Sequence, residues 1–224
     1  MMDILKKLAN PASSDSLATR TRQKNFNIFK DLFSRLSKPL KILDIGGTQE
    51  YWEKMNFSRE EDVEITLLNI YNSEVNYPNF KSIAGDARDL TAFKDKEFDI
   101  VFSHSVIEHV GGLKDQHRMA DEIKRVGKRY FIQTPNLYFP MEPHFLFPMF
   151  QFFPLWLKIW LISHYDLGWY VKTPEKEKAL EIVKSIRLLC KKELYELFPG
   201  AIIYREKFLG LTKSFIVYDG WNNI

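Results

Sequence analysis

This sequence has few of the features that mark disulfide-stabilised, secreted or nucleic-acid-binding proteins. Its single cysteine, Cys190, excludes an internal disulfide and is typical of a reducing compartment. Its net charge of +3 is too small for a nucleic-acid-binding surface, so we expect no nucleic-acid partner. Residues 1–9 mix charged and apolar side chains and do not read as a secretory signal, so we expect a cytoplasmic protein.

The sequence also lacks an uninterrupted apolar run long enough to cross a membrane with ease. Its most apolar stretch, Phe145–Ile162, contains one charged residue, Lys158, and two prolines, Pro148 and Pro154, that would break a helix. Three roles stay open for this stretch: a lid over a site, an interface with a partner or a second copy of the chain, or a peripheral contact with the inner face of the membrane.

Short apolar segments alternate with helical patterns along the chain. The predicted parallel strands are Lys41–Ile45, Glu64–Asn69, Phe80–Ala84, Phe98–Phe102 and Lys128–Gln133, and Ala201–Phe208 with Ser214–Tyr218 predicts a final antiparallel pair. A helix is expected at about 114–126, before the fifth strand. These lengths favour an α/β fold with a doubly wound, mostly parallel sheet that carries helices on both faces.

We expect three parts in the chain. Residues 1–39 are predicted to form an N-terminal amphipathic helical cap that packs on the core or lies on a membrane surface, and residues 40–136 with 190–224 to form the core. Residues 137–189 are predicted to form an aromatic-rich helical insertion after the fifth strand. The cap is predicted from apolar residues at helical spacing: Phe26, Phe29, Leu32, Phe33 and Leu36.

Small, polar or acidic residues follow the end of each predicted parallel strand. They are Asp44–Glu50, Asn69, Gly85–Ala87, Ser103–Ser105 and Thr134–Asn136. Open parallel sheets bind ligands beyond the carboxyl ends of their strands, near the point where the strand order reverses. We therefore expect a polar binding edge there.

The turn after the first strand limits the kind of ligand. Gly46 and Gly47 permit a tight turn and the close approach of a ligand, and Asp44 is placed to hold a ligand ammonium group. Thr48 stands where a dinucleotide-binding fingerprint has its second glycine, which argues against NAD or FAD.

Two later polar residues suit a nucleoside. Asn69 lies near the position from which an acidic residue would hold ribose hydroxyls, and its carbonyl can bond a diol. Asp86 suits an exocyclic amine such as that of adenine, although a turn or helix-capping role is equally open.

Three motifs together resemble one enzyme family. They are Ile42–Gly47, Gly85–Ala87 and Phe98–His109, of which the Ile-Glu-His ending is the most specific. Over about residues 38–136 and 195–219 the chain resembles the class I S-adenosylmethionine-dependent methyltransferases of the small bacterial type. This resemblance implies a Rossmann-like, seven-stranded sheet that ends in an antiparallel hairpin, and S-adenosyl-L-methionine as the cofactor.

The resemblance also implies which residues hold the cofactor. Asp44, Gly46 and Gly47 would line its methionine part, Asn69 and Ile70 its ribose and adenine edge, Asp86 and Ala87 its adenine, and Ser103 and His104 its sulfonium. Thr48, Glu50 and Asn69 depart from the family's pattern.

Catalysis would need few further groups. Methyl transfer from a sulfonium is an in-line displacement, and a base is required only if the acceptor must lose a proton. The candidates are His104, after the fourth strand, and His144, on the loop after the fifth, with capping or supporting roles as the alternative for both. No set of His, Cys, Asp and Glu residues has metal-ligand spacing, so we predict no metal site.

Aromatic residues gather in the insertion. Residues 138–170 contain Tyr138, Phe139, Phe145, Phe147, Phe150, Phe152, Phe153, Trp156, Trp160, Tyr165, Trp169 and Tyr170. We interpret this segment, with a helix at Pro154–Ile162, as a lid, as a pocket or membrane contact for a hydrophobic acceptor, or as a homodimer face. We predict O-methylation of a small or lipid-linked acceptor such as a glycan or quinone precursor. The alternative is a non-catalytic relative that binds a nucleoside or a partner protein.

Overall fold

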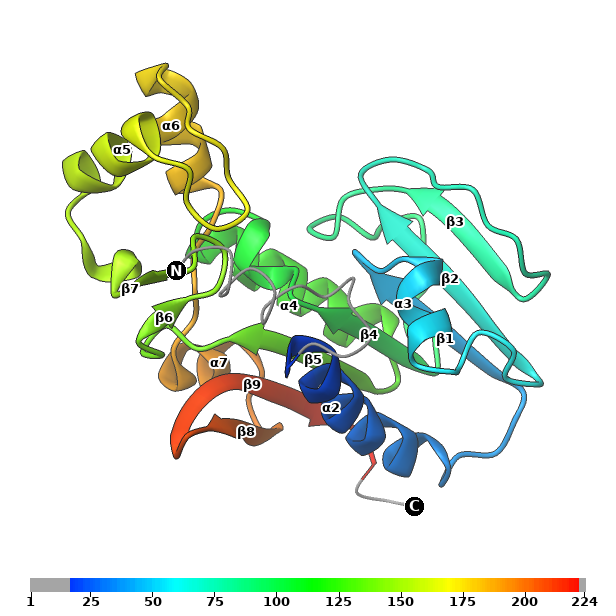
Figure 1. Ribbon diagram of the computed structural model, residues 1–224. Helices are drawn as coiled ribbons and strands as arrows, with labels where there is room; N and C mark the ends of the chain where they lie inside the picture. Colours follow the sequence, from blue (N-terminus) through cyan, green and yellow to red (C-terminus); the bar gives the residue numbers. More distant parts are fainter. Residues whose placement is uncertain (1–16, 222–224) are drawn as a thin grey trace.

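A seven-stranded sheet forms the centre of the computed structural model, which describes residues 17–221 (Figure 1). Its strands lie in the order β3-β2-β1-β4-β5-β9-β8. Their bounds are β1 Leu40–Ile45, β2 Val63–Asn69, β3 Phe80–Ala84, β4 Ile100–His104, β5 Tyr130–Pro135, β8 Ile202–Phe208 and β9 Leu211–Asp219. The strand order reverses beside β1, so the turn after β1 lies where an open sheet binds its ligands.

The strands pair in the directions that the sequence predicts. The strands β1 to β5 run parallel to one another, whereas β9 runs antiparallel to both β5 and β8. The parallel strands read as near-continuous apolar runs because helices cover both faces of the sheet. This architecture confirms the predicted Rossmann-like α/β fold with a doubly wound, mostly parallel seven-stranded sheet and a terminal antiparallel hairpin.

Two of the parallel strands begin two residues later than the sequence predicts. The fourth was expected at Phe98 and the fifth at Lys128, but β4 begins at Ile100 and β5 at Tyr130. Phe98 instead forms an isolated bridge with Gly127, and Lys128 donates a backbone hydrogen bond to Phe98. The chain leaving the preceding helix therefore joins the sheet through this bridge before the regular ladder starts.

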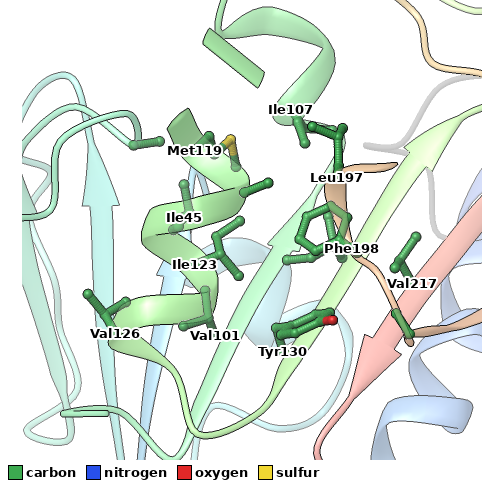
Figure 2. Close-up of a cluster of buried hydrophobic side chains, with 14 of the residues drawn as sticks. Ile45, Val101, Ile107, Met119, Ile123, Val126, Tyr130, Leu197, Phe198 and Val217 are labelled. Carbon is green, nitrogen blue, oxygen red and sulfur yellow. The ribbon is translucent and has the colours of Figure 1, made fainter. Parts of the chain in front are cut away.

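One face of the sheet is covered by α4, Leu113–Val126, and α7, Lys191–Leu197. Figure 2 shows this core, in which side chains of α4 approach the sheet beside the end of α7. The labelled members of the cluster are Ile45, Val101, Ile107, Met119, Ile123, Val126, Tyr130, Leu197, Phe198 and Val217. The predicted helix at about 114–126 thus coincides with α4.

The other face is covered by α2, Leu17–Phe33, and the short α3, Gln49–Lys54. The ring of Phe29 lies 5.1 Å from that of Phe102 in β4 and 5.5 Å from that of Phe131 in β5, measured between centroids. Side chains of α2 therefore pack directly on the sheet, beside the carboxyl end of β4. The division of the chain into cap, core and insertion stays a prediction.

The insertion after β5 builds a small core of its own. It contains β6 Met141–Glu142, β7 Phe147–Pro148, the 3-10 helix η2 Phe150–Phe152, α5 Leu155–His164 and α6 Lys176–Lys184. Phe145, Phe150, Leu161, Ile162 and Leu167 are buried together against Ala179 of α6. Figure 1 shows α5 and α6 standing away from the sheet. Among the described residues, no helix is long and apolar enough to cross a membrane.

Candidate functional site

The turn after β1 leaves no space for a β-carbon. Gly46 has φ +74°, and a β-carbon there would lie 2.4 Å from Val106. A β-carbon on Gly47 would lie 1.6 Å from Oδ2 of Asp44. The backbone N–H of Gly46 donates to the carbonyl of Leu68 in β2 at 2.8 Å, which fixes the turn on the sheet edge. Both glycines are therefore required by the local geometry.

Asp44 is a buried carboxyl group with one free oxygen. Its side chain is 1% exposed, and Oδ2 accepts a hydrogen bond of 2.6 Å from Nε1 of Trp52 in α3. Oδ1 is buried without a partner. Burial raises the pKa of Asp44 to about 7, against the opposing effect of the Trp52 hydrogen bond. An incoming cationic group would find an acceptor here, as the predicted methionine ammonium requires.

Asn69 connects the end of β2 to the glycine turn. Its Nδ2 donates to the backbone carbonyl of Gly47 at 2.8 Å, and this bond determines how the side-chain amide is oriented. The next residue, Ile70, is 65% exposed at the rim. These positions leave the Asn69 carbonyl and the Ile70 side chain beside the turn, where the ribose and adenine edge are predicted to lie.

Asp86 is already paired in this structure. Its carboxylate accepts hydrogen bonds from Arg88, at 2.9 Å from Nε to Oδ1 and 2.6 Å from Nη2 to Oδ2, and from the backbone N–H of Arg88. These hydrogen bonds hold the pKa of Asp86 below its usual range. Its neighbour Ala87 is buried. An adenine amine at Asp86 would share the carboxylate with Arg88, so the adenine assignment stays a prediction.

Two polar residues end β4 beneath the same edge. Ser103 is fully buried and its Oγ has no partner. The ring of His104 lies 5.4 Å from that of Tyr51 in α3, and burial lowers the pKa of His104 to about 3, with the nearby Arg22 acting in the same direction. His104 is therefore neutral near pH 7, which suits a position beside a sulfonium cation.

A cavity of about 250 Å³ joins these groups. It brings together Asp44, Gly46, Gly47 and His104 of the predicted residues, and Asn69 reaches it through Gly47. Ile70, Asp86, Ala87 and Ser103 are not part of its lining. Its remaining lining is Thr19, Arg22, Thr48, Glu50, Tyr51, Lys54, Met55 and Phe102.

The contribution of α2 and α3 to this cavity was not expected from the sequence. Thr19 and Arg22 precede Phe26 and Phe29 at helical spacing, so they lie on the face of α2 that packs on the sheet. This helical spacing is the signal in the sequence that could have placed both residues against the sheet. Tyr51 carried no comparable signal because its place depends on how α3 folds back over β4.

A larger cavity lies elsewhere. It has a volume of about 720 Å³ and is lined by residues that precede β1, β2 and β3, including Pro39, Asp62 and Asn79. It therefore opens at the amino-terminal edge of the sheet, opposite the glycine turn. Since sheets of this kind bind ligands at the carboxyl edge, the smaller cavity is the better candidate for a ligand site.

His144 lies beside a second polar cluster at the carboxyl edge. Its Nδ1 is 2.7 Å from Oε1 of the buried Glu142. Burial lowers the pKa of His144, but the hydrogen bond and charge of Glu142 and the charge of Glu108 outweigh this effect and raise it above its usual value. A ring nitrogen of His144, one of His109 and a carboxylate oxygen of Glu108 lie within 4.8 Å of one another.

The spacing of these residues along the chain gave no sign of this group. Glu108 and His109 belong to the 3-10 helix η1, Ile107–His109, after β4, whereas His144 belongs to the insertion after β5. Parallel neighbours β4 and β5 bring the two loops to the same edge. The prediction of no metal site rested on linear spacing alone.

Comparison with known proteins supports the interpretation of the glycine turn. Residues 44–130 match the family model described as "Methyltransferase domain". Two proteins of Mycobacterium tuberculosis, the uncharacterized proteins MT1557 and Rv1509, are each 39% identical to the chain over 56 residues. The match spans 25% of this chain and 19% of the length of these relatives.

Solved methyltransferases share the fold at low sequence identity. The CurJ carbon methyltransferase is 12% identical, with a TM-score of 0.55 over 88% of this chain and 53% of that one. The 1,6-didemethyltoxoflavin-N1-methyltransferase of Burkholderia thailandensis, solved with 1,6-didemethyltoxoflavin and S-adenosylhomocysteine, is 13% identical, with a TM-score of 0.51 over 96% and 84%. At such identities the likeness establishes the fold.

The residues of the glycine turn fit a cofactor that carries an ammonium group, because the buried Asp44 has a free oxygen at a turn closed to β-carbons. The strand order, the family match over residues 44–130 and this turn agree with one another. Together they indicate a methyltransferase domain over residues 44–130, on a fold that solved methyltransferases share.

Proposed function

We propose that this protein is an enzyme that transfers a methyl group from S-adenosylmethionine to an oxygen atom of a small or lipid-linked acceptor, such as a glycan or quinone precursor. The observation that carries the proposal is the buried Asp44, whose free Oδ1 lies at the turn formed by Gly46 and Gly47. A buried carboxylate oxygen without a partner is costly, so a cationic ligand group there would be bound tightly.

The chain's own residues would position the cofactor. Asp44 would bind the ammonium, the turn would contact the methionine part, and Asn69 would offer its carbonyl to the ribose. His104, neutral at the cavity floor, would lie beside the sulfonium without repelling it. The sulfonium supplies an activated methyl group when bound, so alignment accounts for much of the rate enhancement.

His144 is the group that we propose for removing a proton from the acceptor. Glu142 occupies its Nδ1 and leaves Nε2 to accept a proton. The pKa of His144 lies above its usual value, whereas that of His104 falls to about 3, so His144 is the stronger base of the two. A hydroxyl acceptor must lose a proton during transfer, so a base at this edge of the sheet supports O-methylation.

The insertion offers a place for a hydrophobic acceptor. A cavity of about 260 Å³ lies beside His144, because Glu142 both lines it and holds the His144 ring. Its walls are largely apolar, with two cationic side chains among them: Leu137, Phe145, Phe150, Val183, Ile186 and Leu188 surround Glu142, Gln151, Lys158 and Arg187. Such a pocket suits an acceptor with an apolar body and a polar end.

Exposed aromatic residues on α5 favour an acceptor carried by lipid. Trp156 is 69% exposed and Trp160 is 45% exposed, and they lie one turn apart on the same side of the helix. Phe152 and Leu155 are exposed beside them. Large apolar side chains that remain on a surface mark a contact with a partner or a membrane interface.

Calorimetric titration with S-adenosylmethionine and S-adenosylhomocysteine tests the cofactor site. We expect both to bind, and we expect Asp44→Asn to weaken binding at least about tenfold, since one charge-assisted contact contributes 1.5–3 kcal/mol or so. Glu64→Gln is the matched control, because Glu64 pairs with Lys81 and does not line this cavity. The enzyme proposal is overturned if neither compound binds to the folded protein.

Transfer of a deuterated methyl group to cell extracts tests the acceptor. We expect mass spectrometry to find the label on oxygen in the organic-solvent fraction. Label recovered in water-soluble compounds alone contradicts the lipid-linked acceptor, and label on nitrogen or carbon contradicts O-methylation.

A further inference from the structure

Three side chains with metal-ligating atoms meet where η1 approaches the insertion. They are Glu108, His109 and His144, and one oxygen and two nitrogens of this group lie within 4.8 Å of one another. We propose that this cluster binds one divalent transition-metal ion, with Zn²⁺ as the representative ion. No part of the cofactor cavity overlaps with these residues.

Glu108 gives the first independent sign of a ligand. Its side chain is 0% exposed, and Oε2 accepts a hydrogen bond of 2.9 Å from Oγ1 of Thr134 at the end of β5. Oε1 is buried and has no hydrogen-bond partner. A buried carboxylate oxygen is normally bonded, so an unpaired one beside two imidazoles calls for a cation.

The two histidines give the second sign. Nδ1 of His144 is held by Glu142, and the ring of His109 lies 4.7 Å from that of His144, measured between centroids. Metal-binding histidines generally use one nitrogen for the metal and give the other to a carboxylate or a carbonyl. His144 has that arrangement, with its other ring nitrogen left for an ion.

Glu142 is itself rigidly held. The backbone N–H groups of His144 and Phe145 donate to its Oε2 at 2.8 and 2.7 Å, and the side chain is almost fully buried. A carboxylate fixed in this way determines the orientation of the His144 ring. The pair corresponds to the carboxylate–histidine support found behind metal ions in proteins.

The donor set selects the class of ion. Two imidazole nitrogens and one carboxylate suit Zn²⁺ and its neighbours in the first transition row, whereas Mg²⁺ and Ca²⁺ prefer oxygen ligands. Tetrahedral coordination at about 2.0–2.1 Å sets ligand atoms roughly 3.4 Å apart, so the three groups must approach one another slightly. His109 is exposed and can make this adjustment, and it also gives the ion a route in.

Three protein ligands would leave a coordination position for water or an acceptor oxygen. The use of that position rests on the proposed function, although binding of the ion does not. An ion on Nε2 of His144 would prevent that nitrogen from accepting a proton. The ion would instead lower the pKa of a coordinated acceptor hydroxyl, whose proton would pass to solvent. The proton-accepting and metal-bound forms of His144 therefore exclude one another.

Titration of chelator-treated protein with Zn²⁺ tests the site. We expect one equivalent to bind by calorimetry and by metal analysis, and Mg²⁺ at millimolar concentration not to compete. We expect His109→Asn and Glu108→Gln each to weaken binding at least about tenfold, and Glu142→Gln to weaken it about 10–100-fold, as supporting groups typically do. His109→Asn changes an exposed residue and so keeps the fold.

His164→Asn is the matched control, because His164 is an exposed histidine on α5 outside the cluster. The proposal is overturned if His109→Asn binds Zn²⁺ as the unaltered protein does, or if His164→Asn loses as much affinity. S-adenosylhomocysteine binding separates the two proposals, and we expect His109→Asn to keep it, because His109 does not line the cofactor cavity. If the unaltered protein binds S-adenosylhomocysteine but not Zn²⁺, the metal inference alone is refuted. If it binds Zn²⁺ but not S-adenosylhomocysteine, the cofactor assignment alone is refuted.

Discussion

At the scale of single residues, the carboxylate of Asp44 fills the space that a side chain at position 47 would need. A β-carbon at position 47 would lie 1.6 Å from the Asp44 carboxylate. We expect Gly47→Ala to lower the free energy of unfolding by about 1–3 kcal/mol, which is typical of overpacking, and to weaken cofactor binding. Urea unfolding measures the first effect. Gly112→Ala is the control, because a β-carbon at Gly112 meets no atom within 4 Å.

The buried carboxyl of Asp44 makes the stability of the ligand-free protein depend on pH. Burial raises its pKa from 3.8 to about 7, so between these values the folded state holds a proton that the unfolded state has lost. The contribution of Asp44 to the free energy of unfolding is therefore complete below about pH 4 and is lost as the pH rises to about 7. We expect Asp44→Asn to abolish this part of the pH dependence.

Urea unfolding at several pH values checks this expectation. Relative to the unaltered protein, Asp44→Asn should be more stable at pH 8 than at pH 5, by an amount on the order of a few kcal/mol. The contribution of Glu108 to the free energy of unfolding also falls as the pH rises, since burial raises the pKa of Glu108 to about 7. Only the difference between variant and unaltered protein is therefore informative, and a difference that stays constant with pH contradicts the role given to Asp44.

At the scale of elements, a buried polar contact holds α2 against the final hairpin. Nδ2 of Asn25 donates to Oε2 of Glu206 in β8 at 2.6 Å, and both side chains are buried. We expect Asn25→Ala to destabilise the protein by about 1–3 kcal/mol, because Glu206 loses a buried partner. Cofactor affinity should also fall, since α2 supplies Thr19 and Arg22 to the cavity. Calorimetry and urea unfolding measure the two effects.

The exposed Gln23 on the same helix is the control for Asn25. Gln23→Ala should leave both stability and cofactor affinity unchanged. If Asn25→Ala lowers stability but leaves cofactor affinity intact at a temperature where the variant is folded, α2 does not shape the binding site.

The exposed face of α5 predicts binding to a lipid surface. We expect the protein to float with anionic vesicles at low salt and the double variant Trp156→Ser, Trp160→Ser to remain in solution, because tryptophan side chains provide most of the apolar area on this face. Tyr195→Ser is the control, since Tyr195 is 47% exposed on α7. A membrane contact through α5 is excluded if the double variant floats as well as the Tyr195→Ser control, or if the unaltered protein does not float.

At the scale of the whole molecule, the sequence predicts the sheet well because each buried parallel strand is a short, continuous run of apolar residues. It predicts the glycine turn for the same reason, since Asp44, Gly46 and Gly47 are adjacent. The contacts that it misses join distant segments. Glu108 meets His144 only because β4 and β5 are neighbours, and Arg22 reaches the cavity only because α2 packs on the sheet.

The aromatic insertion illustrates the same limit. Its composition reveals the surplus of rings but not their arrangement. Phe145 and Phe150 form a small core, whereas Trp156 and Trp160 stay exposed. This division depends on how α5 packs against α6, which no periodicity within the segment specifies.

The separation of sheet and insertion predicts where ligand binding stabilises the molecule. A ligand that binds only the folded state slows hydrogen exchange of the elements that surround it. With S-adenosylhomocysteine we expect slower exchange of backbone amides in α2, in α3 and in the turn after β1, because all three line the cavity. Amides of α5 and α6 should exchange at unchanged rates, because these helices form the insertion's own core. Mass spectrometry of exchanged peptides measures both rates. Protection confined to the insertion would show that the cofactor binds in the insertion and not in the cavity at the glycine turn.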